Sequence, residues 1–284
     1  MKIIKKINIM KNYSREEKLK GKKIGFVPTM GALHQGHLSL IRKAREECDR
    51  VVVSIFVNPT QFGPGEDFDR YPRDLESDVR LCEREGVDVV FAPSVEEMYP
   101  ENFSTWVEVK GNLTETLEGA HRPGHFRGVT TVLTKLFNIV IPDCSYFGEK
   151  DYQQALVVKK LVDDLNIPVE IVLAPTIREI DGLACSSRNR YLSKEERRAA
   201  KVLYQSLLRA KTEIQDGEDN PSCIISSMED LILEEPLAKI DYIAIVDPVS
   251  LKPVKRIRGE VLVAVAVKIG KTRLIDNMRI KSVF

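Results

Sequence analysis

The chain of 284 residues is long enough for one large domain or two ordinary ones, and its 43% hydrophobic and 30% charged residues are typical of a soluble globular protein. Its 43 basic and 42 acidic residues nearly balance, which argues against a nucleic-acid partner or an anionic membrane surface. No apolar stretch approaches the length of a membrane span. Five scattered cysteines without a C-x-x-C motif favour a reducing cytoplasm over a disulfide framework or a zinc ribbon.

Five runs rich in valine, isoleucine and phenylalanine show little polar alternation, which is the pattern of buried parallel strands. These runs are residues 22–28, 50–57, 87–93, 144–149 and 168–175. Helix-like segments lie between most of them, over residues 37–48, 73–85, 127–140 and 151–165. Strands that alternate with helices predict an α/β fold with a Rossmann-like parallel sheet covered on both faces. The segment TWVEV near residue 105 is either an extra strand or a lid element.

The pattern changes after residue 182. Residues 193–217 predict one long helix, with Ser193 as its N-cap and Gly217 as its stop. A second helix is predicted to begin at Pro221, and strands follow it, the last two joined by a Gly-Lys turn. We therefore expect a smaller C-terminal α+β domain, which divides the chain into residues 1–182 and 183–284.

Polar or glycine-rich loops follow four of the predicted strands, and open α/β sheets bind ligands beyond the carboxyl ends of their strands. The first loop contains the sequence HQGH directly before a predicted helix. Gly36 lets a ligand approach the backbone, and the free N–H groups of a helix start attract phosphate oxygens. His34 and His37 can donate hydrogen bonds to the same oxygens. A zinc site would need a third and a fourth ligand, yet the chain has only four histidines and its cysteines lie far away in sequence.

The other loops carry cations, hydroxyls and amides. In GEKD, Lys150 supplies a compact positive charge for a phosphate chain, and in SSRNR two hydroxyls and the Arg188 guanidinium suit phosphate oxygens. Gln61 and Gln154 can hold a carboxylate or a hydroxyl without withdrawing charge from it as an arginine would. Taken alone, each residue also fits a solvated turn, a polar linker or an ordinary surface. The convergence of these loops at strand ends favours one binding crevice.

The H-x-G-H motif after a first strand resembles the nucleotidyltransferase superfamily, which includes class I aminoacyl-tRNA synthetases. SSRNRYL occupies the place of that superfamily's second phosphate loop. The longer segments VPTMGALHQGHLSL, SIFVNPTQFGPGEDFDRYPRD, FGEKDYQQ and DGLACSSRNRYLS are similar to the pantoate–β-alanine ligase family, over nearly the whole chain. One departure is Cys185, where that family more often has a larger apolar residue such as methionine.

The resemblance implies an ATP-dependent condensation of (R)-pantoate with β-alanine through a pantoyl adenylate, with release of AMP and pyrophosphate. It also implies a Rossmann-like domain that binds ATP and pantoate, followed by a lid domain. Magnesium is expected to accompany ATP, bound mostly by phosphate oxygens and water, and Asp78 is a possible helper. The expected state is a cytoplasmic homodimer without nucleic-acid or membrane partners.

Carried over position by position, the resemblance implies that His34, His37, Lys150 and Arg188 stabilise charge on the α-phosphoryl group and the leaving pyrophosphate. The resemblance also implies that Asp151 binds the ribose hydroxyls and that Ile177 lies against the adenine. The full set of implied ATP-binding positions is Met30, Gly31, His34, Gly36, His37, Gly148, Glu149, Lys150, Asp151, Ile177, Cys185, Ser186, Ser187 and Arg188. Gln61 and Gln154 are implied to hold pantoate, and Gln61 also β-alanine. His121 and His125 lie either near the pantoate pocket or in a structural loop.

Three other functions remain as alternatives. A simple adenylyltransferase would share H-x-G-H but needs no amine site, so the paired glutamines and the C-terminal domain argue against it. A tRNA synthetase-like or RNA-binding module disagrees with the near-zero net charge and with the lack of an evident anticodon-binding domain. A non-catalytic interaction protein would have no reason to collect histidines and the GEKD and SSRNR loops at strand ends.

Overall fold

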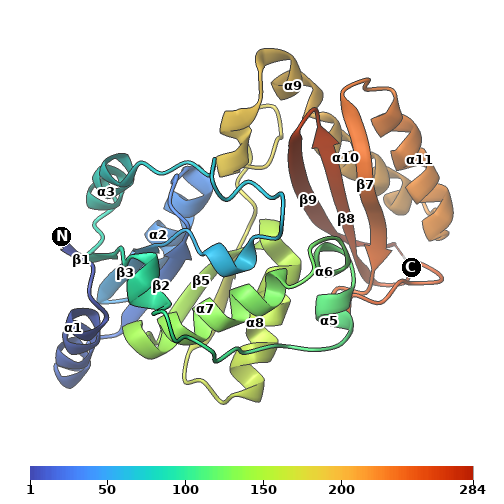
Figure 1. Ribbon diagram of the computed structural model, residues 1–284. Coiled ribbons are helices and arrows are strands. Elements are labelled where there is room, and N and C mark those ends of the chain that lie inside the picture. Colours follow the sequence, from blue (N-terminus) through green and yellow to red (C-terminus); the bar gives the residue numbers. More distant parts are fainter. Residues whose placement is uncertain (284) are drawn as a thin grey trace. The chain divides into compact units, whose positions relative to one another are not determined.

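The computed structural model describes residues 1–283, which form two compact units (Figure 1). The first unit comprises residues 1–114, 118–149 and 153–175, and the second comprises residues 115–117, 150–152 and those from 176 onward. The predicted domain boundary after residue 182 stays a prediction. Within the described residues, no helix is both long and apolar enough to cross a membrane.

Six parallel strands form the sheet of the first unit, in the order β1-β4-β3-β2-β5-β6. Their bounds are β1 (Lys2–Ile4), β2 (Ile24–Thr29), β3 (Arg50–Ile55), β4 (Val89–Phe91), β5 (Cys144–Gly148) and β6 (Glu170–Ala174). The predicted parallel sheet is confirmed, and only β1, which is three residues long, lacks a run in the sequence that predicts it. Strand β2 pairs with β3 on one of its edges and with β5 on the other, so the order of the strands reverses at β2. Such a switch point is where open α/β sheets bind ligands.

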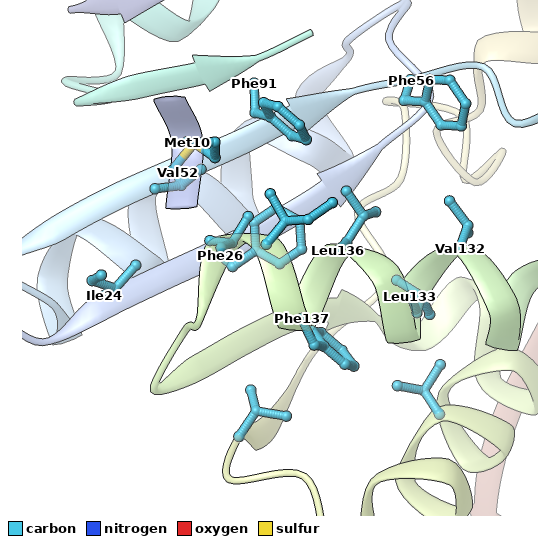
Figure 2. Close-up of a cluster of buried hydrophobic side chains, with 14 of the residues drawn as sticks. Met10, Ile24, Phe26, Val52, Phe56, Phe91, Val132, Leu133, Leu136 and Phe137 are labelled. Carbon is cyan, nitrogen blue, oxygen red and sulfur yellow. The ribbon is translucent and has the colours of Figure 1, made fainter. Parts of the chain in front are cut away.

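Helices connect these strands and cover the sheet (Figure 1). They are α1 (Ile7–Leu19), α2 (Gln35–Glu47), α3 (Leu75–Arg84), α4 (Val95–Met98), α5 (Asn112–Glu115), α6 (Glu118–His121), α7 (His125–Val140) and α8 (Tyr152–Asp164), with the 3-10 turns η1 (Pro59–Gln61) and η2 (Glu149–Asp151). Neighbouring residues of a strand point to opposite faces. Phe26 of β2 therefore packs edge to face on Phe137 of α7 (Figure 2), while Val27 joins Ile41 of α2 in a separate cluster.

The second unit contains a three-stranded antiparallel sheet in the order β7-β8-β9. Its elements are η3 (Ser187–Tyr191), α9 (Lys194–Ala199), α10 (Val202–Gln215), α11 (Pro221–Leu233), β7 (Ala238–Val246), β8 (Glu260–Ile269) and β9 (Thr272–Lys281). The start of a helix at Pro221 is confirmed, and Asn220 caps it by accepting a hydrogen bond from the Ser222 N–H. The predicted Gly-Lys turn is also confirmed, because Gly270 and Lys271 join β8 to β9.

The single helix predicted over residues 193–217 is wrong, because the chain forms α9 and α10 instead. Ser193 is the N-cap as predicted. Between the two helices, the N–H groups of Lys201 and Leu203 each bond to a carbonyl three residues back rather than four. This tighter winding interrupts the α-helix. No glycine or proline marks the interruption in the sequence.

Residues 104–110 form no strand. The Val107 N–H donates to Oγ1 of Thr131 at 3.0 Å, and Oγ1 of Thr130 donates to the Val107 carbonyl at 2.6 Å. Two threonine side chains of α7 thus bind the backbone groups that a neighbouring strand would bind. The strand alternative for TWVEV is therefore wrong.

Candidate active site

The loop after β2 turns sharply at the switch point of the sheet. Gly31 (φ 82°) and Ala32 (φ 52°) both lie in the left-handed region. The two carboxylate oxygens of Asp78, a residue of α3 that is 2% exposed, accept hydrogen bonds from the N–H groups of Ala32 and Leu33, each at 2.8 Å. Asp78 therefore holds the loop in its conformation, which is a different role from the help with magnesium considered from the sequence.

His34 and His37 cap the start of α2 reciprocally. Nδ1 of His34 accepts from the Gly36 N–H at 3.2 Å, and Nδ1 of His37 accepts from the His34 N–H at 3.3 Å. The ring centroids lie 4.0 Å apart. A nitrogen that accepts a hydrogen bond carries no proton, so each neutral ring is protonated at Nε2. Two Nε2–H donors thus stand at the N-terminus of a 13-residue helix, where the helix dipole attracts anions.

The 3-10 turn η1 brings Gln61 to the same loop. Its Nε2 lies 3.3 Å from Sδ of Met30, and its Oε1 accepts from Nδ2 of Asn58 at 3.0 Å. Asn58 is 1% exposed, donates to the Gly128 carbonyl at 3.2 Å, and accepts from the Tyr99 hydroxyl at 2.9 Å. A buried amide therefore orients the Gln61 side chain beside the predicted nucleotide loop.

His125 holds the backbone of Gln61. Its Nδ1 lies 2.8 Å from the Gln61 carbonyl oxygen, and its Nε2 lies 3.2 Å from Nη1 of Arg122. A guanidinium can only donate, so Nε2 accepts and the Nδ1–H donates to Gln61. Burial, followed by the Arg122 charge, lowers the pKa of His125 from 6.5 to about 4. His125 is thus a neutral, structural histidine, whereas His121 is exposed at the end of α6.

Arg122 also holds the loop that follows η1. Its Nε and Nη2 donate to the two carboxylate oxygens of Glu66, at 2.8 and 2.7 Å. Burial raises the pKa of Glu66, but the Arg122 guanidinium outweighs this effect, so that the pKa lies below its ordinary value. The charged pair fixes the loop to the segment between α6 and α7.

The low pKa of His125 predicts a stability that depends on pH. The unfolded chain binds a proton below pH 6.5, whereas the folded protein binds it only near pH 4, so the stability from this residue is lost as the pH falls from 6.5 toward 4. We expect the contribution of His125 to lower the free energy of unfolding by about 2 kcal/mol at about pH 5 relative to about pH 7. Urea unfolding at both pH values measures this difference. His125→Asn, which keeps a donor near the Nδ1 position, should lose this part of the pH dependence, and an unchanged dependence would contradict the assignment.

The serine pair and Arg188 lie on and before η3 in the second unit. Oγ of Ser186 accepts from the Arg188 N–H at 3.3 Å and caps the turn. Ser187 is buried, and Arg188 is half-buried. The Cys185 N–H donates to the Ile177 carbonyl at 2.9 Å, which closes a hairpin over residues 177–185. Buried Cys185 thus supports the segment that carries Ile177.

The predicted site residues divide between the two units. In the first unit the structure brings together the loop after β2 and Gln61, and Gly148 and Glu149 lie at the end of β5. Gln154 is half-buried on α8, a different element from the one that carries Gln61. The second unit holds Lys150, Asp151, Ile177, Cys185, Ser186, Ser187 and Arg188.

Sequence reasoning missed the residues that support this site. Asn58 and Arg122 bind the segment around Gln61, and Asn277 binds the Lys150 carbonyl at 2.7 Å. Asn58 and Arg122 lie within or beside loops whose motifs are visible in the sequence. Asn277 lies far from these loops along the chain. Asn58 is only three residues from Gln61, but the contacts that bury and fix it, with Tyr99 and Gly128, lie tens of residues away, as do the partners of Arg122 and Asn277. No local spacing could have found these distant contacts.

Comparisons with known proteins find relatives that match nearly the whole chain. The family model described as pantoate-beta-alanine ligase matches residues 2–279. The chain is 58% identical to a pantothenate synthetase of Heliobacterium modesticaldum and 59% identical to one of Fervidobacterium nodosum, over 98% of this chain and 99% of each relative.

Solved structures agree as well. The crystal structure of a pantothenate synthetase from Thermus thermophilus matches with a TM-score of 0.94 at 49% identity, covering 98% of this chain and 99% of that one. A pantoate-beta-alanine ligase from Francisella tularensis, complexed with beta-gamma ATP and beta-alanine, matches with a TM-score of 0.82 at 39% identity, covering 98% and 97%.

Proposed function

The chain belongs to the pantoate–β-alanine ligase family and is a ligase that forms pantothenate, and from this premise we propose a reaction in two steps. A carboxylate is a poor electrophile toward an amine, so the carboxylate of (R)-pantoate first attacks the α-phosphorus of ATP, and pyrophosphate leaves. The amine of β-alanine then attacks the acyl carbon of pantoyl adenylate, and AMP leaves. The observation that carries this proposal is the capping pair His34 and His37 at the switch point of the sheet.

In the first step, negative charge develops on the α-phosphoryl oxygens and on the leaving pyrophosphate. His34 and His37 meet this charge with their Nε2–H groups, helped by the N-terminus of α2. Neutral imidazoles donate hydrogen bonds here without the cost of burying a fixed cation. Their main role is therefore to stabilise the transition state by its charge rather than to transfer a proton.

The second unit supplies the remaining groups for the nucleotide. Lys150 and Arg188 provide positive charge for the phosphates, and Ser186 and Ser187 provide hydroxyls. Asp151 binds the ribose hydroxyls, and Ile177 packs against the adenine. The remaining ATP-binding positions from the first unit are Met30, Gly31, Gly36, Gly148 and Glu149. Cys185 supports Ile177 through the hydrogen bond from its N–H to the Ile177 carbonyl.

The neutral amides of Gln61 and Gln154 hold pantoate, and Gln61 also contacts β-alanine. The orientation of the Gln61 side chain by Asn58 supports this role, since a fixed amide binds a carboxylate without withdrawing the charge that must attack phosphorus. The Francisella tularensis relative is complexed with beta-gamma ATP and beta-alanine, which supports ATP and β-alanine as ligands of this chain.

Magnesium accompanies ATP in this proposal and neutralises charge on its phosphates. Both carboxylate oxygens of Asp78 already accept backbone N–H groups, and the described residues contain no group of three or more His, Cys, Asp or Glu side chains that could hold a metal ion. The residues present therefore suit an ion held by phosphate oxygens and water, as is common for magnesium.

Three further expectations belong to the proposal. The C-terminal domain acts as a lid, because the acyl adenylate must be kept from water. The enzyme is a cytoplasmic homodimer, and its five scattered cysteines, which form no C-x-x-C motif, support a reducing compartment. Its partners are its small-molecule substrates, and it has no nucleic-acid or membrane partner.

The products of turnover test the proposal. Purified enzyme with ATP and magnesium should release AMP over many turnovers only when pantoate and β-alanine are both present, because each adenylate must be consumed before the next forms. Chromatography of the nucleotides measures this. A product that retains the AMP group would favour an adenylyltransferase and contradict the ligase reaction.

A further inference from the structure

Two neighbouring residues of β9 hold segments to which the proposed function assigns ATP binding. Successive residues of a strand point to opposite faces of the sheet. Asp276 shares its face with Leu274 and Ile280, which belong to the apolar core of the second unit, and Asn277 lies on the other face. Both are buried, with 2% of Asp276 and 9% of Asn277 exposed.

Asp276 clamps the hairpin that carries Ile177. Its carboxylate accepts two hydrogen bonds from Arg178, at 2.5 and 3.0 Å, and the Arg178 guanidinium lies 4.2 Å above the ring of Tyr204 in α10. Its Oδ1 also accepts from the backbone N–H of Asn277 at 2.8 Å. The backbone at Asn277 is therefore held by an ion pair whose carboxylate is buried, which makes it a rigid support.

Asn277 in turn holds the segment that carries Lys150. Its Nδ2 donates to the Lys150 carbonyl oxygen at 2.7 Å. Two other contacts anchor the same short segment, since the Tyr152 hydroxyl donates to the Pro248 carbonyl at 3.1 Å and Arg279 lies 6.0 Å from the Tyr152 ring. Residues 150–152 belong to the second unit, although only Glu149 separates them from β5 in sequence.

We propose that Asn277 is a positioning residue that fixes the backbone at Lys150 and so places the lysine ammonium for the phosphates of ATP. The hydrogen bond uses the carbonyl of Lys150 and not its Nζ. That Nζ donates to Oδ1 of Asp151 at 3.3 Å, and an ammonium has three protons, so it can donate to phosphate oxygens as well. A three-residue turn such as η2 has little internal structure to hold a long side chain, so an outside anchor is needed. This inference rests on the role of Lys150 in the proposed function.

The experiment compares Asn277→Ala with Asn220→Ala. Both remove an asparagine hydrogen bond in the second unit, but Asn220 only caps α11. We expect Asn277→Ala to lower kcat/KM for ATP in pantoate-dependent ATP–pyrophosphate exchange about 10- to 100-fold, because small misplacements of a catalytic group cost this much. The Asn220→Ala control should stay within about twofold of the original protein, since it changes only the helix cap. Equal effects of the two variants would overturn the proposal.

A double-mutant cycle with Lys150→Ala separates positioning from a general structural role. If Asn277 acts through the Lys150 side chain, adding Asn277→Ala to Lys150→Ala should lower exchange by less than about threefold further. If the fold loss of the double variant equals the product of the fold losses of the two single variants, the proposal is overturned. If Asn277→Ala does not fold, Asn277→Asp, which has the same size but places an acceptor against the Lys150 carbonyl, is expected to give the same pattern in the cycle.

The same cycle distinguishes this inference from the proposed function. A large loss in Lys150→Ala together with original activity in Asn277→Ala would refute only the positioning role. Unchanged exchange in Lys150→Ala would refute the assignment of Lys150 to the phosphates, and the positioning role with it.

Discussion

Replacement of His37 by alanine is expected to lower pantoate-dependent ATP–pyrophosphate exchange about 100- to 1000-fold, the usual cost of one lost hydrogen-bond donor to a charged transition state. Nδ1 of His37 accepts the His34 N–H, so Nε2–H is its donor. The loss should fall mainly on kcat, because the charge that this donor meets develops only in the transition state. Initial rates of exchange at varied ATP concentration measure it.

Two further replacements at His37 test the assignment of the donor atom. A glutamine amide reaches about as far as Nε2, whereas an asparagine amide reaches only about as far as Nδ1. His37→Gln should therefore retain about tenfold more activity than His37→Asn. A tenfold difference corresponds to about 1.4 kcal/mol, which is part of the usual contribution of a charge-assisted hydrogen bond. Equal activity of these two variants would contradict the Nε2–H assignment, and near-original activity of His37→Ala would remove the histidine from the mechanism.

Replacement of Gly128 by alanine is expected to disturb the pantoate end of the site. A Cβ at Gly128 of α7 would lie 2.2 Å from the Thr60 carbonyl oxygen and 2.6 Å from the Gln61 nitrogen, so η1 must move. The overpacking should destabilise the protein by about 1–3 kcal/mol. The displacement of Gln61 should raise KM for pantoate about tenfold, since a shift of a positioning group by a fraction of an ångström weakens its contacts. Urea unfolding and initial rates at varied pantoate concentration measure the two effects.

Gly63→Ala is the matched control for Gly128→Ala. Gly63 lies just beyond η1, and the atoms nearest to a Cβ there, those of the Glu66 side chain, begin at the ordinary distance of 3.7 Å. We expect little change in stability or in KM for pantoate. If Gly128→Ala raised KM no more than this control, η1 would not be the element that positions pantoate.

Much of the fold follows from local sequence patterns. The strands of the parallel sheet are predicted by their apolar runs, because a strand buried on both faces needs no polar alternation. Ser193, Pro221 and the Gly-Lys turn mark their elements by the backbone conformations and caps that these residue types favour. Strand β1 was not predicted, because its three residues lie in a lysine-rich segment and not in an apolar run like the one that contains β4.

Features that depend on distant partners could not be predicted. Val107 lies in an apolar segment that looks like a strand, but threonines of α7 bind its backbone instead. The interruption near Lys201 involves no glycine or proline, and it is visible only in the carbonyl partners of the Lys201 and Leu203 N–H groups. In the site, the motif residues are visible in the sequence, whereas Asp78 and Asn277 act through contacts across many residues of chain.

The central claim is that the pantoate carboxylate is adenylated reversibly before β-alanine takes part. Exchange of labelled pyrophosphate into ATP, with magnesium and pantoate but without β-alanine, tests it most directly. The account predicts exchange that depends on pantoate. A folded protein that binds ATP but gives no exchange under these conditions would contradict the adenylate intermediate, and with it the roles given to His34, His37 and Lys150.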